Sequence, residues 1–263
     1  MAQKRSENTY QKINTIFKRD ENNIIMPDAE FSVPELNWLR NCKFEATEKI
    51  DGTNIRIEAI PVLNVTSTGL NLPYMYDVYY RGKTDNAQIP PHLLKFLKET
   101  YPEDKVLEAL GLPKYFDEEW MTEWGYTSID EVNRYTIYGE GYGVKIQKGG
   151  NYIKDGVGFI VFDVRVNDLY LLRAAYESIA DNLGAPWVPY MGEFTIDEAI
   201  EFVKKGFKST IAENKDYDAE GLVLRAPNGI RTRRGERIIF KIKTCDFIKY
   251  KNKYGDCKTP VCN

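Results

Sequence analysis

The chain has 263 residues, a formal net charge of −3 and a composition that is 43% hydrophobic and 13% aromatic. Such a composition excludes a wholly disordered chain. Because no apolar run approaches about 18 residues and the first residues lack an apolar core, we expect no membrane partner and no signal peptide, and hence a cytoplasmic protein. The four cysteines form no CxxC pair and His92 is the only histidine, which argues against a zinc site.

Charge is divided unevenly along the sequence. Residues 225–263 contain 11 Lys and Arg against 3 acidic residues, a net charge of +8, which leaves −11 for the rest of the chain. A basic segment on an acidic protein predicts one surface that engages a polyanion. A solvated, lysine-rich tail would give the same composition.

The first part of the chain predicts a short helix, then two strands, then further helices. Residues 34–41 read as the short helix, with a proline in its first turn. Residues 44–60 alternate apolar and polar side chains on both sides of Asp51-Gly52, which predicts two strands joined through a tight turn. Between His92 and Trp124 the amphipathic runs LLKFLKETY and DKVLEALG predict helices.

The second part interleaves strands with helices. Strands are predicted in RYTIYGE and GVGFIVFDVRV, and helices follow in LLRAAYESIADNLG and TIDEAIEFVKKG. Thr195 and Glu198 form a capping-box pattern at the start of the last of these helices. Two further strands, EGLVLRAP and ERIIFKIKT, flank a basic turn. Without a regular βαβ rhythm, this order predicts one α+β domain over residues 1–263, with largely antiparallel sheets flanked by helices.

Lys49 is a candidate nucleophile within Lys49-Ile50-Asp51-Gly52. A lysine at the end of a hydrophobic strand can be partly desolvated and placed near other cations, which lowers the pKa of its amine and makes it reactive near neutral pH. Four residues of this kind also arise by chance, and a solvated lysine in a hairpin would look the same.

Charged residues interrupt several of the apolar strands downstream, at Glu140, Asp163, Glu220 and the pair Lys241 and Lys243. Buried charges are costly unless they are paired or bind a ligand. Each one alone suits a structural ion pair, but together they predict one site for a nucleoside triphosphate and Mg²⁺. The two lysines lie two residues apart and should share a face, where they can reach phosphate oxygens. On a purely structural interpretation they would be surface lysines, with the intervening isoleucine pointing inward.

These segments, in this order, resemble motifs I, III, IIIa, IV and V of the covalent nucleotidyltransferases, which comprise DNA ligases, RNA ligases and mRNA capping enzymes. The segments are Lys49-Ile50-Asp51-Gly52, Tyr138-Gly139-Glu140, Phe162-Asp163, Glu220-Gly221 and Lys241-Ile242-Lys243. Within that superfamily the chain is most similar to RNA ligases of the phage T4 RNA ligase 2 type, through YGEGYGVKIQKGGNY. The pieces INTIFKRDE, TEKIDGTNIR and TDNAQIP are similar to short bacterial and phage RNA ligases. The likeness covers about residues 10–245.

The resemblance implies a nucleotidyltransferase fold of the ATP-grasp-like ligase type and a reaction in three steps. Lys49 would attack the α-phosphate of ATP, release pyrophosphate and hold AMP. The AMP would then pass to a 5′-phosphate, and a 3′-hydroxyl would displace it to seal the strand. Mg²⁺ or Mn²⁺ would assist by neutralising charge. The implied partners are ATP and RNA ends, or a nicked duplex containing RNA, acted on by a monomer in a bacterial or phage-infected cell.

The resemblance also implies roles for single residues. Phe162 would stack on adenine. Of Glu140 and Glu220, one would hold the ribose hydroxyls and the other would lie near the metal. The full set implied for catalysis is Lys49, Lys241, Lys243 and Glu220. The set implied for nucleotide binding is Glu48, Ile50, Asn54, Arg56, Lys83, Glu140, Phe162, Lys241 and Lys243. The set implied for the metal is Glu220, Asp163 and Glu140.

The sequence departs from the family pattern at two places. Relatives usually carry an arginine where this chain has Lys83, so bidentate capture of a phosphate is in doubt unless Arg81 supplies it. Only about 20 residues follow Lys243, so we expect a bare catalytic domain without an appended OB domain. Such a domain would bind nucleic acid through its own basic surface. The candidates are Arg81, Arg231, Arg233, Arg234 and Lys249.

Three other functions stay open on the sequence alone. A DNA ligase acting on nicked duplexes shares the KxDG form of motif I. A capping-type guanylyltransferase would use GTP in place of ATP. A binding module could keep the fold and bind a nucleotide without transferring it, although an intact set of motifs argues against that.

Overall fold

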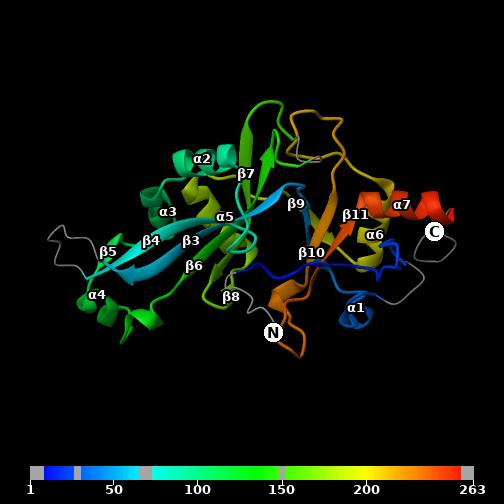
Figure 1. The fold of residues 1–263 in the computed structure, drawn as a ribbon. Coiled ribbons are helices and arrows are strands. Elements are labelled where there is room, and N and C mark those ends of the chain that lie inside the picture. The colour runs from blue at the N-terminus through cyan, green and yellow to red at the C-terminus, as the bar shows by residue number, and fades with distance from the viewer. Residues whose placement is uncertain (1–8, 27–30, 65–72, 148–151, 256–263) are drawn as a thin grey trace. The chain divides into compact units, whose positions relative to one another are not determined.

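The computed structural model describes residues 9–26, 31–64, 73–147 and 152–255 (Figure 1). The chain divides into two compact units. Unit 1 comprises Gly52–Trp187 together with the N-terminal residues up to Tyr10, and unit 2 comprises Gln11–Asp51 and Val188–Asn263. None of the helices in the described ranges is long and apolar enough to cross a membrane. That residues 1–263 form one nucleotidyltransferase domain stays a prediction.

Unit 1 is built on a six-stranded sheet in which every neighbouring pair is antiparallel, in the order β5-β4-β3-β6-β7-β8. Its strands are β3 (Thr53–Leu63), β4 (Tyr74–Gly82), β5 (Tyr115–Phe116), β6 (Tyr135–Gly143), β7 (Val157–Val166) and β8 (Leu169–Tyr170). Its helices are α2 (Pro91–Thr100), α3 (Glu103–Ala109), α4 (Glu118–Glu123), the short 3₁₀ helix η1 (Ile129–Glu131) and α5 (Arg173–Leu183).

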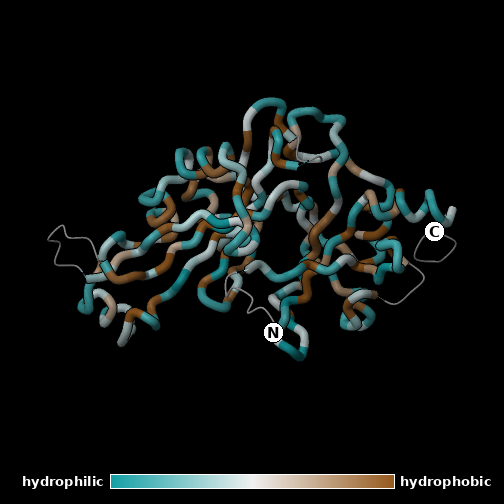
Figure 2. Tube along the Cα trace, viewed as in Figure 1, coloured by the Kyte–Doolittle hydropathy of each residue, from teal (hydrophilic) through white to brown (hydrophobic). Residues whose placement is uncertain are grey.

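The core of unit 1 lies on one face of this sheet. Ile55 and Ile57 of β3 and Ile137 of β6 point to that face and pack against α2, α3 and α5. Because side chains alternate along a strand, the residues between them point to the opposite face. Figure 2 shows brown and teal segments following one another along the strands of both units. The polar face of the unit 1 sheet is therefore the one that carries the candidate site residues of this unit.

Unit 2 is built on a five-stranded sheet in the order β1-β11-β10-β2-β9. Its strands are β1 (Asn14–Thr15), β2 (Phe44–Glu48), β9 (Tyr190–Phe194), β10 (Gly221–Arg225) and β11 (Ile239–Lys243). The β1–β11 pair is parallel and the other pairs are antiparallel. Its helices are α1 (Glu35–Trp38), α6 (Ile196–Lys205), the 3₁₀ helix η2 (Pro227–Gly229) and α7 (Thr244–Tyr254).

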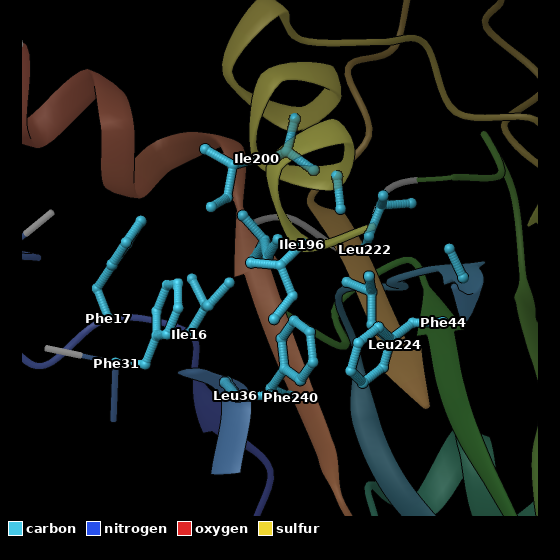
Figure 3. Close-up of a cluster of buried hydrophobic side chains, with 14 of the residues drawn as sticks. Ile16, Phe17, Phe31, Leu36, Phe44, Ile196, Ile200, Leu222, Leu224 and Phe240 are labelled. Carbon is cyan, nitrogen blue, oxygen red and sulfur yellow. The ribbon is translucent and has the colours of Figure 1, made fainter. Parts of the chain in front are cut away.

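The core of unit 2 lies between this sheet and α6, as Figure 3 shows for its main side chains. Phe44, Leu224 and Phe240 come from three neighbouring strands and are fully buried. Ile196 and Ile200 of α6 pack on them, because residues four apart share one face of a helix. The face of the sheet turned away from α6 is left for polar side chains.

Most of the predicted elements are confirmed. The short helix near residue 36, both amphipathic helices after His92, the strands β6, β7, β10 and β11, and the helices α5 and α6 all lie where the patterns placed them. The capping box is also present, since Thr195 accepts a hydrogen bond from the backbone of Glu198 and the Glu198 side chain accepts one in return. The α+β class with largely antiparallel sheets is confirmed as well.

The predicted hairpin around Asp51-Gly52 is wrong. Both strands exist, but β2 pairs with β9 and β10, whereas β3 pairs with β4 and β6 in the other sheet. The backbone N–H of Lys49 donates to the carbonyl of Gly221, 2.8 Å away, so pairing with β10 continues past β2. The chain then leaves unit 2 at Asp51 and enters unit 1 at Gly52.

Sequence reasoning did not predict several elements, among them β1, β4, β9 and α7. The α7 helix occupies residues that were interpreted only as part of a basic tail. Lys148 of the glycine-rich segment after motif III, and Cys257 and Cys262 of the tail, lie outside the described residues.

Candidate active site

Three charged side chains meet at one end of the unit 2 sheet. Lys49 Nζ forms an ion pair with one carboxylate oxygen of Glu220, and Lys243 Nζ lies 2.5 Å from the other oxygen. All three are largely buried, with 19%, 13% and 27% of the side chains of Lys49, Glu220 and Lys243 exposed. One carboxylate therefore holds two ammonium groups beside each other at the edge of solvent.

The ends of three strands place these side chains together. Lys49 directly follows β2, Glu220 directly precedes β10, and Lys243 ends β11 opposite Gly221. The backbone of Thr244 donates to the Glu220 carbonyl at 3.0 Å, which fixes the start of β10 against the end of β11. Antiparallel pairing brings the end of one strand beside the start of the next, so motifs I, IV and V meet although they are far apart in sequence.

Burial and charge shift two pKa values in this cluster. Desolvation raises the pKa of Asp51, and the negative charge of Glu220 raises it further, while the two lysines act in the opposite direction. For Lys243, burial favours the neutral amine, but the hydrogen bond and the charge of Glu220 outweigh it, so its pKa is raised. Lys243 is thus held as a cation.

Lys241 and Lys243 share a face of β11, as their spacing predicted. Ile242 between them is buried in the core of unit 2, and both lysines are half-buried on the other face. This pattern is the one expected of phosphate-binding lysines on a strand, and it also agrees with the structural interpretation in which only the isoleucine points inward.

Glu48 and Ile50 flank the nucleophile candidate but point into the protein. Glu48 is buried, and its carboxylate accepts hydrogen bonds from the hydroxyls of Ser209 and Thr210 and from the backbone of Thr210 at 2.9 Å. Ile50 is also buried. Glu48 therefore holds the loop before β10 in place, and its role toward a nucleotide stays a prediction.

The basic candidates of unit 2 occupy two separate segments. Arg231, Arg233 and Arg234 are exposed in the turn between β10 and β11. Lys249 is exposed on α7. The turn is ordered by a hydrogen bond from Arg231 Nη1 to the carbonyl of Gly235 at 3.0 Å. Exposed cations of this kind can contact phosphates without reading sequence.

In unit 1 the candidates gather on the polar face of the sheet. Asn54 of β3 lies directly opposite Glu140 of β6 in the strand register. The side-chain oxygen of Asn54 is buried and accepts no hydrogen bond within the described part of the chain. A buried acceptor without a donor is costly, so this position is suited to a ligand that donates a hydrogen bond.

A β-bulge places Phe162 and Asp163 together on this face. The register jumps from Asp163 opposite Tyr138 to Val161 opposite Gly139. The ring of Tyr10 meets that of Phe162 edge-on with centroids 5.0 Å apart, and its hydroxyl donates to Asp163 at 2.7 Å. Tyr10 was missed by sequence reasoning, since one tyrosine in an N-terminal segment gives no signal of its contacts.

Arg56 is at the centre of a buried ion-pair network on the same face. It is fully buried, with Nη1 2.8 Å from Glu58 and Nη2 2.7 Å from Asp85. Its Nε donates to the carbonyl of Gly82 at 2.8 Å. Arg56 therefore holds the loop that carries Lys83, and each of its three side-chain nitrogens donates within the protein. Its predicted contact with the nucleotide stays a prediction.

Lys83 and Arg81 differ in their surroundings. Lys83 is exposed in the loop after β4. Arg81 Nε lies 3.0 Å from Glu58, and its guanidinium lies over the ring of Tyr79 at 4.8 Å. An arginine engaged in this way is less available for a phosphate than an exposed lysine. Which of the two binds substrate stays a prediction.

A divalent cation would have to rely on few protein ligands. Among the described residues, no three His, Cys, Asp or Glu side chains lie close enough to hold a metal ion by themselves. This fits Mg²⁺ bound through one or two carboxylates, waters and substrate phosphates. In unit 2, Glu220 is the carboxylate placed beside the two lysines. In unit 1, Glu140 and Asp163 are the predicted ligands.

Comparison with known proteins gives one family and one fold. The sequence model of the family described as RNA ligase matches residues 43–243. The solved structure of Naegleria gruberi RNA ligase with PPi is 17% identical, with a TM-score of 0.55, over 96% of this chain and 59% of that one. Two variants of the same ligase, one with ATP and Mn and one with AMP and Mn, are each 15% identical. Their TM-scores are 0.54 and 0.55, over 94% of this chain and 59% and 60% of theirs.

This chain thus spans about three fifths of the length of those ligases, and at such identities the likeness concerns the fold. No curated protein matches the sequence.

Proposed function

This chain belongs to the RNA ligase family, and from that premise we propose that it is an ATP-dependent RNA ligase of the phage T4 RNA ligase 2 type that carries AMP on Lys49. One observation carries the proposal. The side chain of Lys49 is four-fifths buried and shares the carboxylate of Glu220 with Lys243. A lysine held in this way, with a second cation beside it, is suited to attack a phosphorus atom that bears negative charge.

In the first step Lys49 Nζ would form a bond to the α-phosphorus of ATP, and the bond from that phosphorus to pyrophosphate would break. The ammonium group must first lose a proton, which the adjacent Glu220 carboxylate is placed to accept. Lys243 and Lys241 would neutralise charge on the phosphates. Glu220 would also help to hold a divalent cation, which would supply further neutralisation of phosphate charge.

In the second step an oxygen of an RNA 5′-phosphate would attack the phosphorus of the AMP, and Lys49 would leave as a free amine. In the third step a 3′-hydroxyl would attack the 5′-phosphate and release AMP, which seals the strand. The lysines are reused in each step, because every transition state spreads negative charge over phosphate oxygens. Exposed cations of the turn at Arg231, Arg233 and Arg234 would hold the RNA backbone.

For unit 1 we propose the roles that the family resemblance implies. The buried oxygen of Asn54, together with Glu140 opposite it, offers acceptors for ribose hydroxyls. Phe162 offers a ring for adenine, and its position is fixed by the edge of Tyr10. The ATP, AMP and Mn²⁺ of the Naegleria structures support the use of an adenine nucleotide and a divalent metal.

Intact-mass spectrometry of the full chain with ATP and Mg²⁺ tests the proposal. We expect an added mass of one AMP, lost again on addition of nicked duplex RNA as sealed product forms. Lys49→Ala should abolish the adduct, and Lys43→Ala, at an exposed lysine outside the cluster, should retain it. Circular dichroism would show that both variants are folded. No adduct on the wild-type chain, or an adduct that survives Lys49→Ala, would contradict the assignment.

The same assay separates the competing functions. Nicks that differ only in a 3′-ribose or a 3′-deoxyribose distinguish an RNA ligase from a DNA ligase, and we expect faster sealing with the ribose. GTP in place of ATP should give no adduct, whereas a capping-type enzyme would be labelled by GTP. Removal of metal with EDTA should stop adduct formation, and excess Mg²⁺ or Mn²⁺ should restore it.

A further inference from the structure

A groove lined by cations lies at the edge of the unit 2 sheet. It has a volume of about 500 Å³ and lies between the β1 edge, the end of β11 and the first turns of α7. The basic residues that line it are Lys12, Lys18, Arg19, Lys241, Lys243 and Lys249. The acidic residue among its described lining residues is Asp246. Apart from Lys241 and Lys243, these cations belong to none of the ligase motifs.

The acidic group among the described residues of the groove is already neutralised. Asp246 is buried, and one of its oxygens lies 2.6 Å from Arg19 Nη2. Arg19 is held further by a hydrogen bond from Nη1 to the carbonyl of Asn23 at 2.8 Å. This pair fixes the first turn of α7 to the segment after β1. Lys12 and Lys249, which are exposed, add positive charge to the groove.

The first turn of α7 adds to the positive potential. The helix runs from Thr244 to Tyr254 and begins directly after Lys243, so the positive end of its dipole lies at the end of the groove where that lysine lies. Figure 2 shows α7 as mainly hydrophilic. Lysines that converge on a concave surface repel one another, and an anion bound between them removes that repulsion.

The position of the groove indicates which anion it binds. Lys243 lines the groove and also contacts Glu220, which in turn contacts Lys49. The groove thus begins at the cluster where, on the proposed function, the α-phosphorus is attacked. The group that leaves this phosphorus is pyrophosphate, a compact and highly charged anion. A groove confined to the β1 edge, the end of β11 and the first turns of α7 suits such an anion, whereas an RNA strand would follow a longer surface.

We propose that this groove binds the pyrophosphate end of ATP, and that Lys12 of the N-terminal segment and Lys249 of α7 contact its phosphates. The proposal rests on the proposed function, because ATP must be the substrate. It assigns Lys249 to the nucleotide and not to RNA. Lys12 and Lys249 are exposed at the rim of the groove, so they can engage and release the anion without unfolding any element.

Calorimetric titration of the full chain with inorganic pyrophosphate tests the groove directly. For the double variant Lys12→Ala/Lys249→Ala we expect affinity about tenfold weaker than for the wild type, which corresponds to about 1.4 kcal/mol. Lys251→Ala removes one charge from the same helix outside the groove and serves as the matched control, with affinity unchanged within about twofold. Unchanged affinity in the double variant would overturn the proposal.

Step-resolved kinetics then separate pyrophosphate from RNA. In the double variant we expect the KM for ATP in adenylylation to rise about tenfold and pyrophosphate-driven removal of AMP from Lys49 to slow. Sealing of RNA that already carries a 5′-adenylate should be unchanged, because that step uses no pyrophosphate. A defect confined to sealing would overturn the proposal and make the groove an RNA site. If the wild type forms no adduct with ATP, the proposed function fails, whereas pyrophosphate titration still reports on the groove.

Discussion

Removal of the buried guanidinium by Arg56→Met tests whether the network on the polar face of unit 1 stabilises the fold. Arg56 is fully buried and makes hydrogen bonds to Glu58, Asp85 and the carbonyl of Gly82. Methionine has a similar length and no charge, so it should fill the space. The substitution leaves the Glu58 carboxylate, which is 2% exposed, without its main cation.

The size of the effect follows from which charges stay buried. Breaking a buried ion pair by removing one partner typically costs about 3–5 kcal/mol. Glu58 keeps one cation, because Arg81 Nε lies 3.0 Å from its other oxygen, and Asp85 is 46% exposed and can be hydrated. We therefore expect a loss at the lower end, about 3 kcal/mol of unfolding free energy. The double variant Arg56→Met/Glu58→Met should recover about 1–2 kcal/mol of that, since no carboxylate is then left buried.

Urea unfolding of the full chain, followed by fluorescence and circular dichroism, measures these differences. Arg40→Met is a matched control, because Arg40 and its partner Asp197 are 42% and 50% exposed, and exposed pairs contribute about 0–1 kcal/mol. A loss below about 1 kcal/mol for Arg56→Met would show that the network does not stabilise the sheet. A double variant less stable than the single one would refute the reasoning about the orphaned carboxylate.

Two further predictions concern local geometry in unit 2. Gly221→Ala should unfold more easily and form less AMP adduct, because the residue has a φ of +149° and an added Cβ would collide with the carbonyl of Ile242. Gly229→Ala is its control, with a φ of +66° and open space around the Cβ, so it should lose stability and keep adduct formation. Glu198→Gln should lower the urea midpoint at pH 7 and matter less as the pH falls. The hydrogen bond from Lys43 and the helix-capping hydrogen bonds lower the pKa of Glu198 from 4.5 to about 2, so its stabilising contribution is present above pH 4.5 and lost as the pH falls toward 2. A midpoint difference that stayed constant from pH 7 to pH 3 would contradict this.

Local signals in the sequence predicted most of the elements and part of the site. Period-two alternation identified β10 and β11, and it placed Lys241 and Lys243 on the face opposite the buried Ile242. Such patterns succeed because one face of each strand is buried, which fixes its register. The meeting of Lys49, Glu220 and Lys243 was predicted from charges that interrupt apolar strands and from the motif resemblance, since no local pattern states which strand ends are neighbours.

The wrong hairpin shows where local signals fail. An Asp-Gly pair between two alternating runs is the strongest short-range hairpin signal, yet β2 and β3 belong to different sheets. Each strand finds its partners elsewhere, and β4 and β6 together pair with the whole length of β3. Gly52 is needed here for another reason, because a Cβ at this position would collide with the carbonyl of Gly141. The glycine permits a close approach between two backbone segments. A tight turn also favours glycine, so the sequence alone does not distinguish the two causes.

The bulge in β7 shows most clearly where the rule fails that successive side chains of a strand point to opposite faces. A strict period of two would put Phe162 and Asp163 on opposite faces of the strand. The bulge adds one extra residue to β7 opposite Tyr138 and Gly139, so the strict alternation of faces is interrupted there. Tyr10 contacts both side chains, Phe162 through its ring and Asp163 through its hydroxyl. Because a bulge depends on the partner strand, the sequence of β7 alone does not contain it. The register that β6 imposes therefore brings the aromatic and the acid of one short motif to the same partner, Tyr10.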